Sequence, residues 1–453
     1  IGKSILNCDD NGPTVMMIVN MTIDPAAGPV AIGRLFSGTI KDGQNINIID
    51  TKREGRVQSV NFFMSNIREQ VGELGAGNIP ALLGLTEARA GQTVSSIKDV
   101  GLFEPSKYVS EPVVQMAIEP KHPKDLPQLV ETLRKLTIED PNLVIKIDEE
   151  TGETIMAGMG VLHLDVAVNL IKDAKIEIIT SEPLINYRET ILGSSDAVMA
   201  KSPNRHNKIF MAVQPLEPEI AEMCRDGTLS EMKDKKETAQ ILRDHGWEPD
   251  IAKKVMRFDS RGNVMINGTK GVQFVDESTD SILSGFEEVM SEGGLTKEQV
   301  RNCKFTFTHF VPHEDTAHRG LSQLGPAARR ACLGAFLSAQ PMILEPMLAI
   351  EVRVPTDLIG NVSSVLQGKR GKVLDMQQKG AASIVIGEVP AVETFDISEK
   401  MRGQTAGKAI WNTHFKAWTP VPKSIGATLL QDIRKRKGLS PDPPQANEFI
   451  DKD

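Results

Sequence analysis

One strand-and-helix pattern occurs twice in this 453-residue chain and constrains its fold more than any other feature. Residues 111–120 and 345–355 both alternate apolar and polar side chains and end at a proline, as edge or terminal strands do. A helical pattern follows each, over 124–136 and over 357–367. Further strands and a second helix come after both. The sequence therefore predicts two ferredoxin-like βαββαβ domains within one multidomain α+β chain.

The first of these helices supplies the clearest core prediction. Its apolar side chains recur at helical spacing, so we expect them to share one buried face: Leu126, Leu129, Val130, Leu133 and Leu136. The two ferredoxin-like domains are expected at about 108–184 and 342–423.

The length of the chain leaves room for three to four domains of ordinary size. Short alternating strands at 14–19, 30–36 and 45–49, separated by turn residues, are typical of a small β-barrel, expected at 1–107. An α/β segment is expected at 185–341, with helices over 229–245 and 280–291. The tail, 424–453, is expected to begin as a helix over 428–437 and to end in a proline-rich stretch.

Composition excludes several classes of protein. No apolar run approaches the ~20 residues that cross a bilayer, and the start at Ile1 has no secretory h-region. The four cysteines, Cys8, Cys224, Cys303 and Cys332, form no Cys-x-x-Cys pair, so neither a disulfide framework nor a zinc knuckle is indicated. That pattern favours a reducing cytoplasm. The chain begins without methionine, from which we expect a fragment of a longer protein.

The basic residues are grouped although the formal net charge is −8. The net charge argues against a general nucleic-acid coat but permits local contact with phosphates. One group is Lys201, Arg205, His206 and Lys208; a second is His318, Arg319, Arg329 and Arg330; a third is 434–437. Any single group is more often a solvated surface than a binding site.

His318 is the most informative single residue, because it lies between a predicted strand at 304–308 and a predicted helix at 326–336 that opens on Pro326. The run 315–323 reads Asp-Thr-Ala-His-Arg-Gly-Leu-Ser-Gln. A histidine exposed on a loop between rigid elements is a candidate for binding chemistry.

This run, Asp-x-x-His-Arg-Gly-x-x-Gln followed by Pro-Ala-x-Arg, resembles the tip of domain IV in the archaeal and eukaryotic elongation factor 2 family. Three further motifs recur in family order, at 33–38, 157–165 and 202–208. The resemblance covers essentially the whole chain. It implies that 1–107 is domain II, 108–184 domain III, 185–341 with 424–453 domain IV (of the ribosomal S5 domain 2-like type), and 342–423 domain V.

The resemblance also implies a function, promotion of GTP-dependent ribosomal translocation of tRNA and mRNA, with the tip of domain IV entering the decoding centre. In the family the histidine matching His318 becomes diphthamide. The contact residues carried over are His318, Arg319 and Gly320, with Asn204, Arg205, His206 and Lys208 from the neighbouring loop. Leu321-Ser322 replaces the paired glycines of eukaryotic members or the Pro-Ala common in archaeal ones. The compact loops resemble archaeal members more closely than eukaryotic ones.

The implied partners are rRNA, the tRNA–mRNA duplex and the ribosomal proteins of the factor-binding site, together with the diphthamide-synthesis enzymes. A cytoplasmic monomer without a membrane partner is expected. The cofactor would be GTP with magnesium, bound by an N-terminal domain that precedes Ile1 in the family, because this chain contains no Gly-x-x-x-x-Gly-Lys-Ser/Thr loop and no Asn-Lys-x-Asp. The nearest fragment, 368–372, lacks the glycine spacing and more often ends a helix. These residues alone should not hydrolyse GTP, and no catalytic, cofactor or metal residue is assigned to them.

Three alternatives stay open. The chain could be a ribosome-binding paralogue that does not hydrolyse GTP, or a relative that works in RNA splicing. A metallohydrolase could use His309, His313 and His318 with Glu314 and Asp315, although Pro312 interrupts the helical spacing between the first two histidines. His163 is expected to anchor the start of a helix rather than to act in chemistry.

Overall fold

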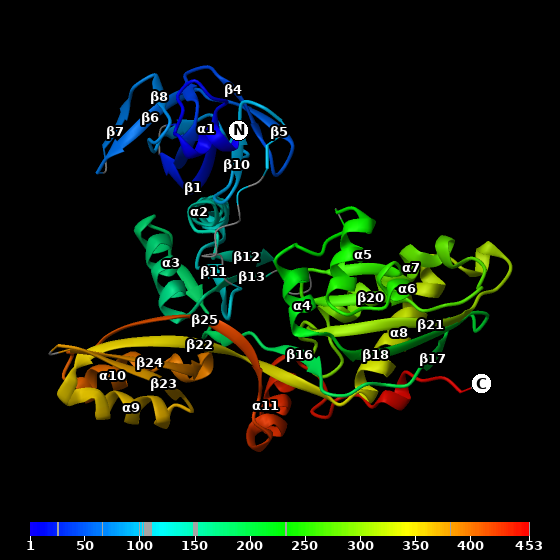
Figure 1. Cartoon of the computed structure of the whole chain (residues 1–453). Helices are drawn as coiled ribbons and strands as arrows, with labels where there is room; N and C mark the ends of the chain where they lie inside the picture. The colour runs from blue at the N-terminus through cyan, green and yellow to red at the C-terminus, as the bar shows by residue number, and fades with distance from the viewer. Residues whose placement is uncertain are drawn as a thin grey trace. The chain divides into compact units, whose positions relative to one another are not determined.

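Alternating apolar side chains build several antiparallel sheets, which fall into two compact units, Ile1–Ile185 and Asn186–Asp453 (Figure 1). The computed structural model describes residues 1–24, 27–65, 67–98, 100–101, 103, 111–147, 153–231, 233–380 and 382–452. The domain boundary predicted at 107/108 lies outside these described residues.

An eight-stranded antiparallel sheet, in the order β5-β4-β10-β1-β2-β9-β6-β7, fills the first part of unit one. Its strands confirm the predicted short alternating pattern, and strands from both halves of the sheet, as far out as β4 and β6, contribute side chains to one core cluster, so the sheet curls around that core. The elements are α1 Gly2–Leu6, β1 Val15–Asp24, β2 Gly28–Ser37, β3 Thr39–Lys41, β4 Asn45–Ile48, β5 Arg53–Arg56, β6 Ser59–Met64, β7 Ile67–Gln70, β8 Glu73–Gly75, β9 Ala81–Leu83 and β10 Thr93–Ser95.

The second part of unit one has the connectivity β-α-β-β-α-β. Its strands pair antiparallel in the order β12-β13-β11-β14, so the first and third strands are neighbours at the centre. The elements are β11 Val114–Pro120, α2 Leu126–Glu139, β12 Val144–Ile147, β13 Thr154–Gly158, α3 Val161–Asp173, β14 Ile178–Thr180 and β15 Leu184–Ile185.

The predicted core face of α2 was only partly right. Leu129, Leu133 and Leu136 are buried, but Leu126 is 46% exposed and Val130 is 52% exposed. The helix also begins at Leu126, after a 3₁₀ turn at Pro123–Asp125, rather than at Lys124. A side chain in the first turn and one at the edge of an apolar stripe can meet solvent while the centre of the stripe stays buried.

The same connectivity recurs in unit two, where β22 to β25 with α9 and α10 form a sheet in the order β23-β24-β22-β25, extended by β16. The segments that follow the two repeated strand patterns therefore share one order of strands and helices. The elements are β16 Arg188–Ile191, β22 Pro341–Pro355, α9 Ile359–Gly368, β23 Lys372–Lys379, β24 Ala382–Pro390, α10 Ile397–Thr405, β25 Ile410–Pro420 and α11 Lys423–Arg436.

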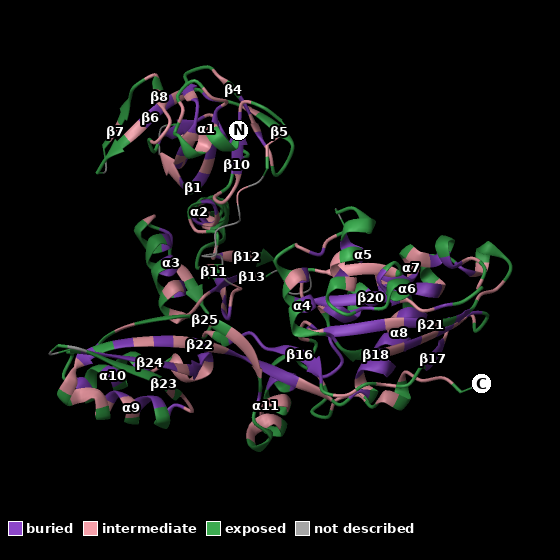
Figure 2. Ribbon diagram, viewed as in Figure 1, coloured by how far each residue is buried: buried purple, intermediate pink, exposed green. Residues whose placement is uncertain are grey.

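The rest of unit two, which we call the arm, is a sheet in the order β17-β18-β21-β20-β19 that is parallel only between β20 and β21. The helices α7 and α8 pack together, and α8 contacts β17 and β18 while Phe286 of α7 stacks edge-on against Phe305 of β21. Figure 2 shows the buried strands beneath them. The elements are β17 Val198–Lys201, β18 Lys208–Pro215, α4 Pro218–Arg225, α5 Lys235–Asp244, α6 Pro249–Ala252, β19 Val255–Asp259, β20 Asn263–Asn267, α7 Val275–Ser291, β21 Cys303–Val311 and α8 Leu321–Ser338.

Three helix predictions in unit two need correction. The helix expected at 229–245 begins only at Lys235, because Asp234 caps α5 by accepting from the Lys236 N–H; the preceding helix, α4, ends at Arg225. The helix expected to open on Pro326 begins five residues earlier, and Gly320 is its N-cap. The tail helix α11 begins at Lys423 rather than at 428, directly after Pro422.

Candidate functional site

Two loops at one end of the arm sheet bring the predicted tip residues together. Loop 202–207 joins β17 to β18, and the segment 312–320 joins β21 to α8. Because β18 pairs with β21 and Lys208 lies opposite Val311, both loops leave the sheet at the same end. We call them the first and second tip loops. The expectation that these segments are neighbours is confirmed.

Asn207 connects the two tip loops from the inside. Its side chain is completely buried, and its Nδ2 donates to the backbone oxygen of His318 at 2.7 Å and to Ser202 Oγ at 3.1 Å. Its Oδ1 accepts from the backbone N–H of His313 at 2.9 Å. The two hydrogen bonds that this buried amide makes with the second tip loop give the two loops a single relative arrangement.

A second set of contacts reinforces this arrangement. Gln323, in the first turn of α8, accepts from the backbone N–H of Asn204 at 3.0 Å. Asp315 caps the 3₁₀ turn Thr316–His318 by accepting from the Ala317 N–H. His318 therefore lies on a short turn that is held at both ends.

Three imidazole rings meet at the tip. The ring centroids of His206 and His318 are 5.0 Å apart, those of His313 and His318 are 4.6 Å apart, and those of His206 and His313 are 5.0 Å apart. The metal alternative had grouped His309 with His313 and His318, but the centroid of the His309 ring lies 5.3 Å from that of the Phe210 ring instead. The His313 Nδ1 accepts from the Asp315 N–H, so it is already occupied. Within the described residues, no group of three His, Cys, Asp or Glu side chains is arranged to hold a metal ion.

Arg319 lies inside the tip rather than on its surface. Its side chain is only 4% exposed, and it donates to the His313 carbonyl at 3.1 Å and to Glu277 Oε2 at 3.1 Å. Its guanidinium carbon lies 3.8 Å from the centroid of the Phe274 ring, a cation–π contact. We predicted Arg319 as a contact residue, but these contacts make it a brace that joins the second tip loop to the start of α7.

The outer surface of the tip carries donors suited to an anionic partner. Arg205, His206 and Gly320 are exposed, whereas His318, Asn204 and Lys208 are half-buried. Arg205 adopts a positive φ of 60°, which turns the chain sharply beside His206. Guanidinium, imidazole and backbone N–H groups held in fixed positions can bind phosphate and hydroxyl groups without reading a base sequence.

Most of the other predicted basic residues make contacts within the arm, although only Arg434 is buried. Arg330 pairs with Asp451 at 2.9 Å, and Lys201 donates from Nζ to the carbonyl of Lys452, so both tie the C-terminal segment to the arm. Arg329 lies 3.3 Å from Glu288. In the third group, Arg434 is buried and donates to the Leu295 carbonyl. These residues stabilise the arm rather than extend the tip surface.

Sequence reasoning missed Phe274 and Glu277, which hold Arg319, and did not separate Asn207 from its neighbours. Phe274 has a positive φ of 62°, and no sequence motif indicates this. A buried Arg between two loops needs a carboxylate, but any of the chain's 60 acidic residues could have supplied it.

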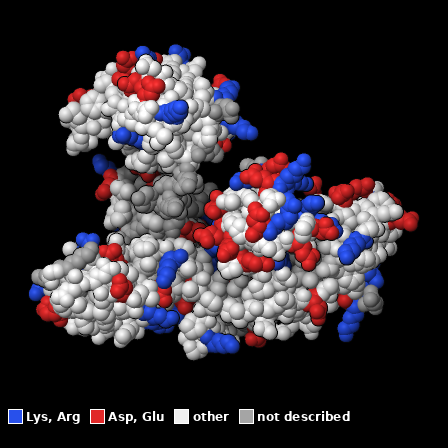
Figure 3. All heavy atoms as spheres, viewed as in Figure 1, with Lys and Arg blue, Asp and Glu red and all other residues white. Residues whose placement is uncertain are grey.

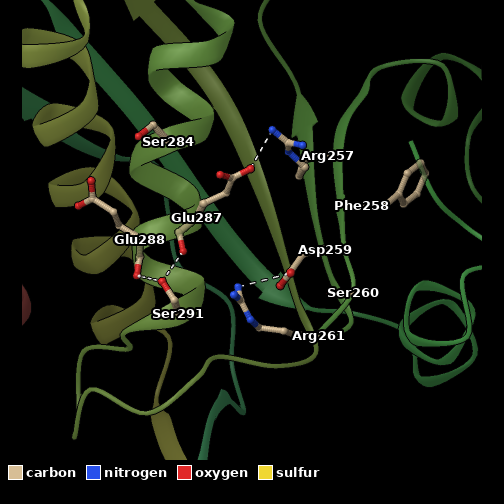
Figure 4. Close-up of a pocket in the computed structure, with 9 residues that line it drawn as sticks. All are labelled: Arg257, Phe258, Asp259, Ser260, Arg261, Ser284, Glu287, Glu288 and Ser291. Atoms are coloured by element: carbon tan, nitrogen blue, oxygen red, sulfur yellow. Dashed lines mark hydrogen bonds and ion pairs between the residues drawn. The ribbon is translucent and has the colours of Figure 1, made fainter. Parts of the chain in front are cut away.

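A separate cavity of about 540 Å³ lies between β19 and α7 (Figure 4). Its charged groups are already engaged: Arg257 pairs with Glu287 at 2.8 Å, Arg261 lies 3.5 Å from Asp259, and Glu288 pairs with Arg329. Paired charges of both signs give this cavity no evident preference for a charged ligand.

The remaining motifs have structural roles. His163 accepts from the Met159 N–H through Nδ1, and its Nε2 lies 2.7 Å from Asp140 Oδ2, so it anchors the start of α3 as predicted. The fragment 368–372 ends α9, with Arg370 at a positive φ of 52° and paired with Glu345 and Glu393. In the part of the chain that the structure describes, no helix is long and apolar enough to span a membrane.

Four models of known protein families match successive segments of the chain. Residues 28–95 match the model of elongation factor Tu domain 2, 109–182 that of elongation factor G domain III, 228–340 that of elongation factor G domain IV, and 342–429 that of the elongation factor G C-terminus. The whole chain is 71% identical to elongation factor 2 of Cenarchaeum symbiosum. Over 99% of its length it is 45% identical to elongation factor 2 of Sulfurisphaera tokodaii. It spans 62% of the length of each of these relatives.

Proposed function

The chain belongs to the elongation factor 2 family, and on that premise we propose that it acts in GTP-dependent ribosomal translocation of tRNA and mRNA. The arm tip is the part that enters the decoding centre. The observation that carries this proposal is the pair of tip loops joined through buried Asn207, which holds His318 at a rigid polar end of the arm.

Four domains are inferred. Residues 1–107 form a β-barrel, 108–184 and 342–423 are ferredoxin-like, and 185–341 with 424–453 form the arm of ribosomal S5 domain 2-like type. The strand order of the two repeated sheets and the contacts of Asp451 with Arg330 and Lys201 support this division.

His318, Arg205 and His206 contact the codon–anticodon duplex or the rRNA around it, with Gly320, Asn204 and Lys208 at the edge of the contact. Arg319 positions the second tip loop from inside. A wide, shallow RNA minor groove displays phosphates and 2′-hydroxyls, to which these donors can bind in any sequence context. Such contact keeps codon and anticodon paired while the ribosome moves, and so preserves the reading frame.

His318 is also the site of diphthamide formation, which requires that the synthesis enzymes reach its half-buried ring. GTP and magnesium act at a nucleotide site outside these 453 residues, since the sequence contains no P-loop motif. The remaining partners are the ribosomal proteins of the factor-binding site, and the protein acts as a cytoplasmic monomer.

The test uses the protein as purified from its source cells, with ribosomes carrying mRNA and tRNA, and follows mRNA movement after GTP addition. We expect His318→Ala to leave ribosome binding intact, to slow mRNA movement and to raise frameshifting several-fold. Unchanged movement and reading frame would refute the assigned role of the tip. Ribosome binding by the wild-type protein without mRNA movement would identify a non-translocating paralogue instead.

A further inference from the structure

A second cavity in the arm, also of about 540 Å³, lies away from the tip loops. Its walls come from the loop before α5, the first turns of α5 and α7, the turn between α6 and β19, and the end of β20. This volume is within the range of pockets that bind small organic ligands. It shares no residue with loop 202–207 or with the segment 312–320.

Lysine side chains dominate the rim of this cavity: Lys233, Lys235, Lys253 and Lys254. All four are exposed, and none makes an ion pair with a residue that the structure describes. Of the two carboxylates in the lining, Glu231 is already 2.6 Å from Arg257 Nη1, which leaves Asp276. Figure 3 shows lysine and arginine side chains in the region of α5, with aspartate and glutamate side chains around them. Unpaired like charges around one cavity favour an anionic ligand.

The other walls add an apolar surface and an unused donor. Val255 and Phe258 form part of the apolar wall and pack against the core under α4, α5 and α6. Asn267 Oδ1 accepts from the N–H and the hydroxyl of Thr269, and its Nδ2 has no partner in the described part of the chain. Ammonium and amide donors beside an apolar wall match a ligand with one highly charged end and one flat, weakly polar end.

We propose that this cavity binds a phosphate-bearing ligand of nucleotide size, with its phosphates among the four lysines and its base against the wall of Val255 and Phe258. Lysines from two separate segments, 233–235 and 253–254, can contact one compact group with several acceptor oxygens, which a phosphate provides and a single carboxylate does not. The ligand is a free nucleoside phosphate or a nucleotide of an RNA strand, because both present this chemistry.

Two probes distinguish these sources: adenosine triphosphate and a 5′-phosphorylated six-nucleotide single-stranded RNA. Each is titrated calorimetrically into the 453-residue chain, which contains no P-loop motif to bind a nucleotide elsewhere. We expect one saturable site whose affinity falls as salt is raised. Lys235→Gln and Lys254→Gln should each weaken binding about tenfold, a typical effect of losing one charge-assisted contact.

Lys236→Gln is the matched control, since it removes the same charge from the next position of α5 without altering the lining. Triphosphate binding that the two lining variants weaken and the control does not would establish a nucleoside phosphate site. Hexanucleotide binding at least tenfold tighter than triphosphate binding, with the same dependence on the variants, would establish an RNA strand as the ligand. If neither probe binds, or if the control weakens binding as much as the lining variants, the proposal is wrong. Thermal unfolding of each variant checks that the fold is retained.

Discussion

The Asn207 side chain donates from Nδ2 to the backbone oxygen of His318 at 2.7 Å, although 111 residues separate the two in sequence. Asn207→Ala removes this bond and leaves the partly buried His313 N–H without its acceptor. We expect a loss of about 2–3 kcal/mol in the free energy of unfolding, because buried groups lose their partners. Chemical denaturation measures it.

The matched control is Asn204→Ala. Its side-chain contacts to His318 are long, at 3.4 and 3.5 Å, its Oδ1 accepts from Ser202 Oγ and the His206 N–H only within the first tip loop, and the residue is only partly buried. We expect this change to cost less than half as much. Hydrogen exchange should then show the amides of 313–319 exchanging faster in Asn207→Ala than in Asn204→Ala. Equal exchange in the two variants would contradict the role given to Asn207.

Arg319→Ala should destabilise the arm by about 2–3 kcal/mol, because it removes two hydrogen bonds and the contact with Phe274 from a buried position. Glu277→Gln should cost well under 1 kcal/mol, since Glu277 is 63% exposed and water replaces the lost charge contact. Both values come from denaturation curves. A larger effect of Glu277→Gln than of Arg319→Ala would mean that the ion pair, rather than the packing, holds the loop.

Gly285 allows α7 and α8 to approach closely. A Cβ at this position would lie 2.4 Å from the Gly325 carbonyl oxygen and 2.7 Å from the Arg329 nitrogen, both backbone atoms that cannot turn aside. Gly285→Ala should therefore cost about 1–3 kcal/mol. Gly403→Ala, in α10 with no atom within 4 Å, should instead stabilise by about 0.5–1 kcal/mol. Opposite shifts in melting temperature would confirm both.

The local sequence pattern predicted those features of the fold that depend on residues close together in the chain. Alternation and helical spacing gave the repeated sheets, and the loop position of His318 followed from the strand before it. Pro326 was misleading because proline favours helix starts, yet here Gly320 begins α8 and Pro326 falls inside it. The cost of proline inside a helix is tolerated where tertiary packing holds the helix, as α7 does here.

Contacts between distant segments could not be read from the sequence. Glu189 is completely buried and accepts from the backbone N–H groups of Leu295, Thr296 and Glu298, more than 100 residues away. Burial raises the pKa of this carboxyl. A carboxylate is normally predicted at the surface, and only the fold identifies the N–H groups that make this exception possible.

Thiol reactivity should separate one cysteine from the other three. Cys8 is exposed, whereas burial raises the pKa of Cys224 to about 12 and also raises the pKa of Cys303 and Cys332. Only the thiolate reacts, so at neutral pH a thiol reagent should modify one cysteine in the native chain and four after denaturation. Peptide mapping should place the native label on Cys8. Rapid labelling of Cys332 would contradict the packing of α8.

The C-terminal segment should detach from the arm in acid. Partial burial raises the pKa of Asp451, but the Lys201 N–H and the Arg330 guanidinium outweigh that effect and hold the pKa below its usual value. Because its folded-state pKa is lowered, the Asp451 carboxylate stabilises the docked segment at pH values above its unfolded-state pKa of about 4. This stabilisation is lost as the pH falls through the folded-state pKa. Asp451→Asn should therefore weaken docking at neutral pH and remove this acid dependence.

Asp442→Asn is the control, because Asp442 is exposed and makes no ion pair with any described residue. Hydrogen exchange of 445–452 between pH 3 and pH 7 measures both, and an acid dependence that persists in Asp451→Asn would assign it to another group.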